Sequence, residues 1–163
     1  LQLAGYGPLR TRLEQLVSEL GLARNVELLG FRDDVLALLQ GADVFLLPSL
    51  SEGCSLALAE ALASGTPAIG SNVGGIPEVM QDLGQQWLIA PTDVDAWAAA
   101  VCRMIELGGA QRQELGRKAA EVASRFSPET NIHAVQELYR KLLADKGRPF
   151  TYPPAAEPVT ARP

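Results

Sequence analysis

Residues 43–70 read Asp43-Val-Phe-Leu-Leu-Pro-Ser-Leu-Ser-Glu-Gly-Cys-Ser-Leu-Ala-Leu-Ala-Glu-Ala-Leu-Ala-Ser-Gly-Thr-Pro-Ala-Ile-Gly70. The apolar run from Asp43 to Leu47 predicts a buried strand, and Leu56 to Ser64 has the composition of a helix that ends at Gly65. The run from Thr66 to Gly70 predicts the next strand. A strand, a helix and a second strand in this order are typical of a parallel sheet covered by helices.

The same alternation continues on both sides of this segment. The apolar patterns predict further strands at Leu1–Ala4, Asn25–Leu29 and Gln86–Ile89, and helices at Pro8–Leu20, Val35–Leu39, Val94–Leu107, Ala110–Arg125 and Pro128–Leu143. Asp34 or Asp33, Asp93 and Ser127 are the expected N-caps. The predicted fold class is therefore α/β, a Rossmann-like parallel sheet flanked by helices with a helical C-terminal extension.

The length of 163 residues predicts one domain followed by a tail. Residues 1–146 form the predicted domain, which is incomplete at its N-terminus because the sequence begins in a strand pattern at Leu1. Residues 147–163 are the predicted tail, a linker or disordered end, since five of the last fifteen residues are proline. We therefore expect the sequence to be part of a longer protein.

Charge and composition exclude several classes of protein. The net charge of −5 argues against nucleic-acid capture through a general basic field. Cys54, Cys102 and the single His133 have no zinc-type spacing, so we expect reduced thiols and a cytoplasmic protein. No apolar run approaches the roughly 20 residues of a membrane span. Peripheral attachment of the full-length protein to the inner membrane stays open.

Three unusual loops follow predicted strands: residues 5–8, 48–55 and 71–78. In open α/β sheets, ligands bind at the carboxyl ends of the strands, so we expect these loops to lie along one edge. Gly53, Cys54 and Ser55 precede a helix whose first N–H groups have no intrahelical acceptor, an arrangement that favours a diphosphate without metal. The alternative is an ordinary helix capped by Ser55 or Ser51.

Glu52 and Glu60 are separated by seven residues. Glu60 stands among alanines and leucines, where an unpaired charge is unfavourable, so ribose hydroxyls of a ligand are natural partners. The alternative is a glutamate that reaches solvent from the helix edge. Gly74 and Gly75 are either a second glycine loop close to a sugar or a tight turn into a helix.

The N-terminal segments carry weaker signals. Gly5 and Gly7 match the first two glycines of a dinucleotide fingerprint, but Arg10 stands where the third glycine is needed. Phe31 follows a strand and is interpreted as a side chain that stacks on a base or, alternatively, as part of the core. His133 and Arg10 are expected on solvated helix faces.

Taken together, five segments closely resemble the C-terminal, donor-binding lobe of retaining glycosyltransferases of the GT-B fold, the family 4 group also described as glycosyl transferases group 1. These segments are Leu3–Arg10, Asn25–Phe31, Ala42–Ser49, Glu52–Pro67 and Val73–Glu78. The resemblance extends over about residues 1–145, and the glutamate pair in this context is its most specific part.

The resemblance implies transfer of a hexosyl group from a nucleotide sugar, a UDP- or GDP-hexose, to an acceptor hydroxyl. It implies retention through a front-side displacement and no obligatory metal or other cofactor. The implied catalytic residue is Glu52, near the donor hexose, and Glu60 would hold the ribose. The other implied donor-binding residues are Gly53, Cys54, Ser55 and Leu56 at the sugar and diphosphate, Gly5, Gly7, Phe31 and Arg32 at the nucleotide, and Gly74 and Gly75.

Two departures from the family pattern bear on function. Cys54 and Ser55 replace a commoner aromatic or leucine followed by proline or glycine, which would change sugar preference. The family's diphosphate-clamping Arg/Lys segment and its N-terminal acceptor lobe, the expected partner of this lobe, are not in this sequence, so we predict that residues 1–163 alone do not transfer sugar.

Three other readings remain open from the sequence. They are a non-catalytic nucleotide-sugar-binding or interaction module, an epimerase or phosphorylase of similar fold, and a nicotinamide-binding domain. Both glutamates and the glycines argue against the first, the glutamate spacing against the second and the missing third glycine against the third. The open sheet edge at Leu1–Ala4 could also pair with another copy of the chain.

Overall fold

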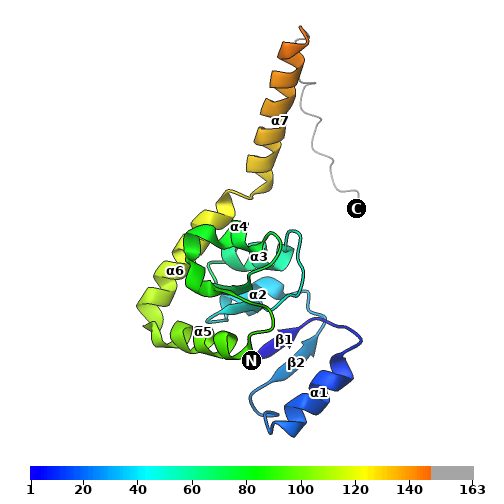
Figure 1. The fold of residues 1–163 in the computed structure, drawn as a ribbon, viewed down its shortest axis with the longest axis vertical. Helices are drawn as coiled ribbons and strands as arrows, with labels where there is room; N and C mark the ends of the chain where they lie inside the picture. Colours follow the sequence, from blue (N-terminus) through cyan, green and yellow to red (C-terminus); the bar gives the residue numbers. More distant parts are fainter. Residues whose placement is uncertain (148–163) are drawn as a thin grey trace, which may run out of the picture.

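The computed structural model describes residues 1–147, and Figure 1 shows their arrangement. Apart from Gly147, the predicted proline-rich tail lies outside the described residues. Strands and helices alternate as predicted before three consecutive helices. In chain order the elements are β1 (Gln2–Ala4), α1 (Arg10–Glu19), β2 (Glu27–Gly30), α2 (Val35–Gln40), β3 (Phe45–Leu47), α3 (Leu56–Ala63), β4 (Ala68–Ser71), α4 (Ile76–Met80), two 3₁₀ turns (Gln81–Leu83 and Gln85–Trp87), β5 (Leu88–Ile89), α5 (Val94–Glu106), α6 (Gly108–Ser124) and α7 (Pro128–Asp145).

The described strands pair in parallel, which confirms the predicted class of sheet, and they form two sheets. One sheet contains β1 and β2, with Leu3 opposite Leu28. The other has the order β3-β4-β5, with Leu47 opposite Gly70. β4 is therefore the central strand of the larger sheet, and all four of its residues are buried.

The hydrophobic core surrounds β4. Its largest fully buried apolar side chains come from helices packed against the larger sheet and from β4 itself: Leu58, Leu62, Ile69, Ile76, Met80 and Met104. Two glycines bring α3 and α6 close together, because a Cβ atom on Gly116 would lie 2.1 Å from the carbonyl oxygen of Gly65. This close approach places α3, which carries Glu60, firmly against the core.

Most helix ends follow the predicted capping signals. The side chains of Ser55, Asp93 and Ser127 each accept a hydrogen bond from the backbone N–H three residues ahead. Asp34 precedes α2 but makes no side-chain cap. Its carboxylate is instead bound by Arg32, with Nε and Oδ1 2.7 Å apart. The expectation that Asp34 acts as a side-chain cap is therefore wrong.

Several predicted boundaries shift by a few residues in the structure. The last strand spans only Leu88–Ile89 because the preceding residues form a 3₁₀ turn that buries Trp87. The first helix begins at Arg10 rather than Pro8, and α6 begins at Gly108 rather than Ala110. These shifts do not change the order of the elements.

Helix α7 extends away from the rest of the domain (Figure 1) and buries none of its side chains. Its exposed apolar residues include Ile132, Val135, Leu138, Tyr139 and Leu142. His133 is also exposed, as predicted. Among residues 1–147, no helix combines the length and apolar character needed to cross a bilayer.

Candidate functional site

Two loops meet at the carboxyl ends of the neighbouring strands β3 and β4. The backbone N–H of Gly75 donates a hydrogen bond to the carbonyl oxygen of Glu52, with N and O 3.4 Å apart. A Cβ atom on Gly74 would lie 1.7 Å from the same oxygen, and one on Gly75 would lie 2.2 Å from the carbonyl oxygen of Gly53. Only glycines permit this contact, so Gly74 and Gly75 support the Glu52 loop as well as starting α4.

Glu52 is half-buried in this loop. The hydroxyl of Ser49 donates a hydrogen bond to its carboxylate, with Oγ and Oε1 2.9 Å apart. Ser49 was not a candidate from the sequence. A serine three residues before an acidic side chain in the same loop is the signal that would have indicated it.

The start of α3 is adjacent to the same loop. Ser55 caps the helix by accepting a hydrogen bond from the Leu58 N–H, with N and Oγ 3.3 Å apart. The capped-helix alternative therefore describes the Ser55 side chain correctly. The N–H groups of Leu56 and Ala57, in the first turn of α3, have no acceptor within the helix. Cys54 is a free, exposed thiol beside them.

Glu60 is exposed, which corrects the expectation that its carboxylate lies in apolar surroundings. The buried residues of α3 are Leu58, Ala61 and Leu62, and they define the face that packs on the core. At about 100° per residue, Glu60 falls on the other side of the helix. Its carboxylate forms no hydrogen bond or ion pair with residues 1–147, so the solvent-facing alternative describes it.

A second group of candidates gathers at the carboxyl ends of β1 and β2. The backbone N–H of Gly5 donates to the carbonyl oxygen of Gly30, with N and O 2.7 Å apart. The rings of Tyr6 and Phe31, which follow these glycines, are tilted by 59° with centroids 6.4 Å apart. Phe31 is 75% exposed, so the alternative that it is a core residue is wrong.

Arg32 lies beside this aromatic pair but is already engaged. Its guanidinium binds Asp34 through two nitrogens and lowers the pKa of that carboxyl below its ordinary value, chiefly through the hydrogen bonds. The same contact raises the pKa of Arg32. A ligand at this position would therefore share Arg32 with Asp34 or displace it.

The candidate residues thus fall into two groups. Gly5, Gly7, Phe31 and Arg32 follow the strands of the smaller sheet, whereas Glu52 to Leu56, Gly74 and Gly75 follow β3 and β4. The structure confirms that the loops of residues 48–55 and 71–78 lie at one edge. Between the two groups, residues 1–147 form no hydrogen bond or ion pair.

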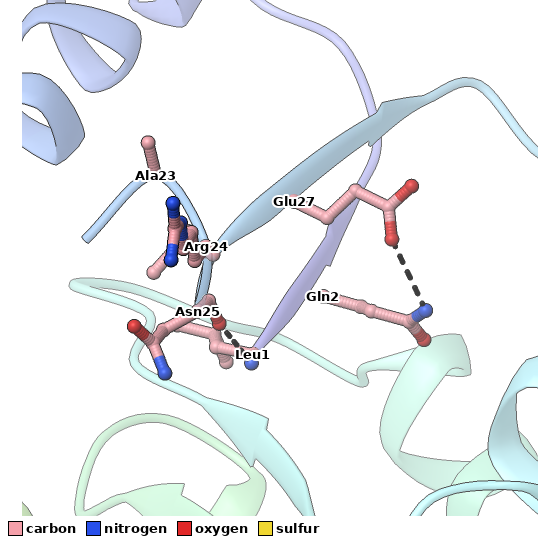
Figure 2. A pocket seen from close by; sticks show the side chains of 7 residues that line it. Leu1, Gln2, Ala23, Arg24, Asn25 and Glu27 are labelled. Atoms are coloured by element: carbon pink, nitrogen blue, oxygen red, sulfur yellow. Dashed lines mark hydrogen bonds between the residues drawn. The ribbon is translucent and has the colours of Figure 1, made fainter.

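An open depression of about 310 Å³ lies elsewhere, and Figure 2 shows the side chains around it. Its lining comes from the amino ends of β1 and β2 and the turn before β2, including Gln2, Arg24 and Glu27. Ligand sites of open α/β sheets lie at the carboxyl ends of the strands, so this depression is not the candidate site. Among residues 1–147, no three His, Cys, Asp or Glu side chains gather in a way that could hold a metal ion.

Comparisons with known proteins agree with this architecture. The family model described as glycosyl transferases group 1 matches residues 1–122. D-inositol 3-phosphate glycosyltransferase from Mycobacterium marinum is 38% identical over 136 residues, which cover 82% of this chain and 29% of that protein. Its counterpart from Corynebacterium urealyticum is 33% identical over 132 residues, covering 80% of this chain and 31% of the relative.

Solved structures show the same fold. Sucrose-phosphate synthase from Thermosynechococcus elongatus has a TM-score of 0.75 and 33% sequence identity, with 89% of this chain and 39% of that chain covered. HepE from Anabaena, in complex with UDP-glucose, has a TM-score of 0.72 and 23% identity over 88% of this chain and 40% of that chain.

These matches, with the parallel sheets flanked by helices, define a Rossmann-like α/β domain of the kind found in GT-B glycosyltransferases. The chain belongs to the glycosyl transferases group 1 family. It spans 29% of the length of the Mycobacterium marinum relative, so it corresponds to one part of such an enzyme.

Proposed function

We propose that this chain is the donor-binding part of a glycosyltransferase that transfers a hexosyl group from a nucleotide sugar to an acceptor hydroxyl with retention. The observation that carries this proposal is the meeting of two loops at the carboxyl ends of β3 and β4, where the Glu52 carboxylate accepts a hydrogen bond from Ser49 in the loop between β3 and α3. Membership of the glycosyl transferases group 1 family supports the transferase class. The fold is compatible with the donor, since HepE has the same fold and its structure contains UDP-glucose.

The two glutamates and the start of α3 have distinct roles in this proposal. Glu52 orients the donor hexose and stabilises the positive charge that develops in an oxocarbenium-like transition state. The free N–H groups of Leu56 and Ala57, at the positive end of the α3 dipole, stabilise the leaving diphosphate. Glu60 is exposed and has no protein partner within residues 1–147, so its carboxylate is available to ribose hydroxyls.

The second group of residues would bind the nucleotide. Tyr6 and Phe31 present exposed aromatic rings at the carboxyl ends of β1 and β2, and such rings stack on bases. Gly5 and Gly7 leave their backbone accessible beside them. We propose UDP- or GDP-hexose as the donor and no obligatory metal, because the N–H groups at the start of α3 supply the stabilisation that a cation would otherwise provide.

Thermal unfolding of the full 163-residue chain with and without nucleotides tests this proposal. A ligand that binds the folded state raises the melting temperature by mass action. We expect UDP or GDP and its hexose conjugate to raise it for the wild-type chain and for the control Glu106→Ala, which changes an exposed glutamate of α5. The shift should be lost in Glu60→Ala.

The outcomes separate the competing functions. An equal shift in Glu60→Ala would remove Glu60 from the donor site. Absence of a shift with every nucleotide sugar, for this chain and for the full-length protein, would favour an interaction module that does not bind a donor. A shift with a nicotinamide dinucleotide alone would favour a dehydrogenase-type domain.

A further inference from the structure

The backbone of Glu52 is held by the loop that follows β4. The carbonyl oxygen of Glu52 accepts the Gly75 N–H at 3.4 Å, and Gly74 is so close that a Cβ atom there would lie 1.7 Å from this oxygen. Both sides of the contact are backbone, so no change of side-chain rotamer can relieve or loosen it. The position from which the Glu52 side chain starts is therefore well defined.

The side chain of Glu52 depends on a different contact. Among residues 1–147 its one hydrogen-bond partner is the Ser49 hydroxyl, at 2.9 Å from Oε1, and no Lys or Arg forms an ion pair with it. A glutamate has three rotatable side-chain bonds, so a carboxylate without a partner populates several rotamers. Oε2 has no partner in the described part of the chain, which leaves it available for a ligand hydroxyl.

We propose that Ser49 is a positioning residue for donor binding: it selects the Glu52 rotamer in which Oε2 binds a hydroxyl of the donor hexose. This inference rests on the proposed function. Ser49 touches Glu52 and not the sugar, so it acts through the carboxylate. Its contribution is expected with a hexose donor and not with the nucleotide diphosphate alone.

Calorimetric titration of the full chain with UDP and with UDP-glucose tests the proposal. In Ser49→Ala we expect the affinity for UDP-glucose to fall about tenfold relative to that for UDP, the scale of one hydrogen bond to a charged group. Ser49→Thr keeps a hydroxyl donor and should retain the wild-type ratio. Ser51→Ala, which removes an exposed hydroxyl from the same loop, is the matched control.

A double-mutant cycle with Glu52→Ala, which removes the acceptor of the Ser49 hydroxyl, separates positioning from a general effect on folding. If Ser49 acts through the carboxylate, Ser49→Ala should cost little further affinity when Glu52 is already replaced. An equal loss in both backgrounds, or an equal loss for UDP and UDP-glucose, would overturn the proposal while leaving the proposed function intact.

A measurement without ligand covers the case in which the wild-type chain binds neither compound, a result that would count against the proposed function. Crystal structures of Ser49→Ala and Ser49→Thr would then decide the role of Ser49. We expect Glu52 to occupy several rotamers in the alanine variant and one in the threonine variant. A single unchanged rotamer in Ser49→Ala would overturn the proposal.

Discussion

Both sheets consist of parallel strands connected by helices, but their residues are buried to very different extents. In residues 1–30, two strands and α1 contribute no buried residue, and β1 alternates between exposed and half-buried positions. In residues 39–122, β4 is buried throughout and supplies the centre of the core. β4 has a strand on each side and is packed by helices, whereas each strand of the smaller sheet has one neighbour. The difference in burial between β4 and the strands of the smaller sheet therefore reflects how many strands and helices pack around each strand, and not the type of element.

The contrast also affects the candidate site. The loops around Glu52 follow β3 and β4, which pack in the hydrophobic core. Gly74 and Gly75 hold these two loops in close backbone contact. Tyr6 and Phe31, in contrast, follow the strands of the smaller sheet, which contains no buried residue. We infer that the sugar and diphosphate end of the proposed site is more rigid than the nucleotide end.

Truncation of a core leucine should give the largest effect. Leu62 is fully buried in α3, so Leu62→Ala removes buried methylene groups and leaves a cavity. We expect the free energy of unfolding to fall by about 2–5 kcal/mol. Leu16→Ala is the matched change in α1, where the leucine is 38% exposed, and should cost about 1 kcal/mol or less. Urea unfolding of both variants measures the difference. Equal losses of unfolding free energy would show that α1 is packed as tightly as α3.

A methyl group at Gly74 should give the next largest effect. In Gly74→Ala the new Cβ atom would overlap the Glu52 carbonyl oxygen, and φ at this residue is +54°. We expect a loss of about 1–3 kcal/mol, because backbone must move to admit the methyl group. Gly109→Ala in α6 meets no atom within 4 Å and should not destabilise the chain. Chemical unfolding checks both variants. An unchanged free energy of unfolding in Gly74→Ala would mean that the close contact between the two loops does not contribute to stability.

Loss of the Arg10 side chain should have a smaller, local effect. Arg10 joins α1 to β2 by donating to the Leu28 carbonyl oxygen at 3.3 Å, and it also binds Glu14. Because the pair is exposed, we expect Arg10→Ala to cost no more than about 1 kcal/mol. Amide hydrogen exchange should accelerate in β1 and β2 and stay unchanged in β4. Faster exchange in β4 would show that the regions unfold together.

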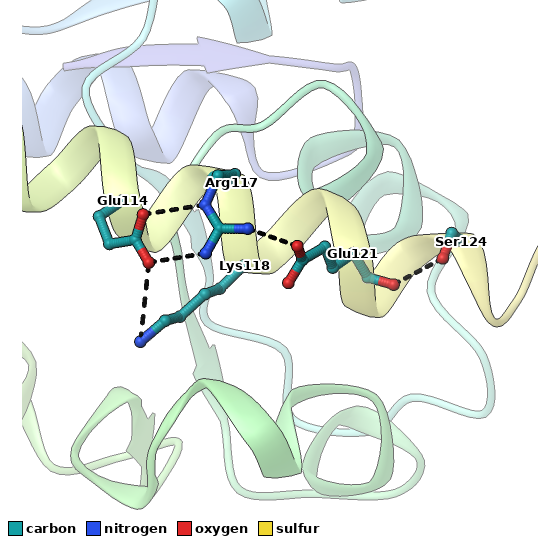
Figure 3. Close-up of polar contacts among 5 residues, drawn as sticks. All are labelled: Glu114, Arg117, Lys118, Glu121 and Ser124. Atoms are coloured by element: carbon teal, nitrogen blue, oxygen red, sulfur yellow. Dashed lines mark hydrogen bonds and ion pairs between the residues drawn. The ribbon is translucent and has the colours of Figure 1, made fainter.

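The smallest effect should come from the ion pairs on the outer face of α6, which Figure 3 shows. Arg117 donates hydrogen bonds to Glu114 and lowers the pKa of that carboxyl below its ordinary value. A lowered pKa in the folded state means that this stabilisation is present above the pKa of the unfolded chain and is lost as pH falls through the folded value.

In Glu114→Gln we therefore expect the melting temperature to fall slightly less steeply than in the wild type as the pH is lowered from about 5 to about 3. Melting curves across this range, at low and high salt, measure the change, since salt weakens exposed pairs. Glu106→Gln is the control, because Glu106 forms no ion pair within residues 1–147. An identical pH profile for Glu114→Gln and the wild type would show that the pair contributes nothing.

Local sequence signals predicted many features of this fold. The caps at Asp93 and Ser127, the helix end at Gly65 and the order of strands and helices were predicted correctly, and Ser55 was one of two serines considered as the cap of α3. Each depends on residues within a few positions of one another, where preferences of the backbone and of short polar side chains decide the conformation. The family resemblance, confirmed by the comparisons, rests on such short segments in order.

Other features were decided by contacts between distant parts of the chain. Glu60 faces solvent because of how α3 packs on β4 and α6. Phe31 is exposed because the smaller sheet that it follows has no buried residue, and its ring lies near that of Tyr6. The Gly74 and Glu52 contact exists because β3 and β4 pair side by side.

The sequence by itself therefore determined the elements, their order and the family, since these follow from local preferences and periodicity. Tertiary structure alone decided which face of each element is buried and which loops touch, because burial depends on neighbours that pairing and packing bring together.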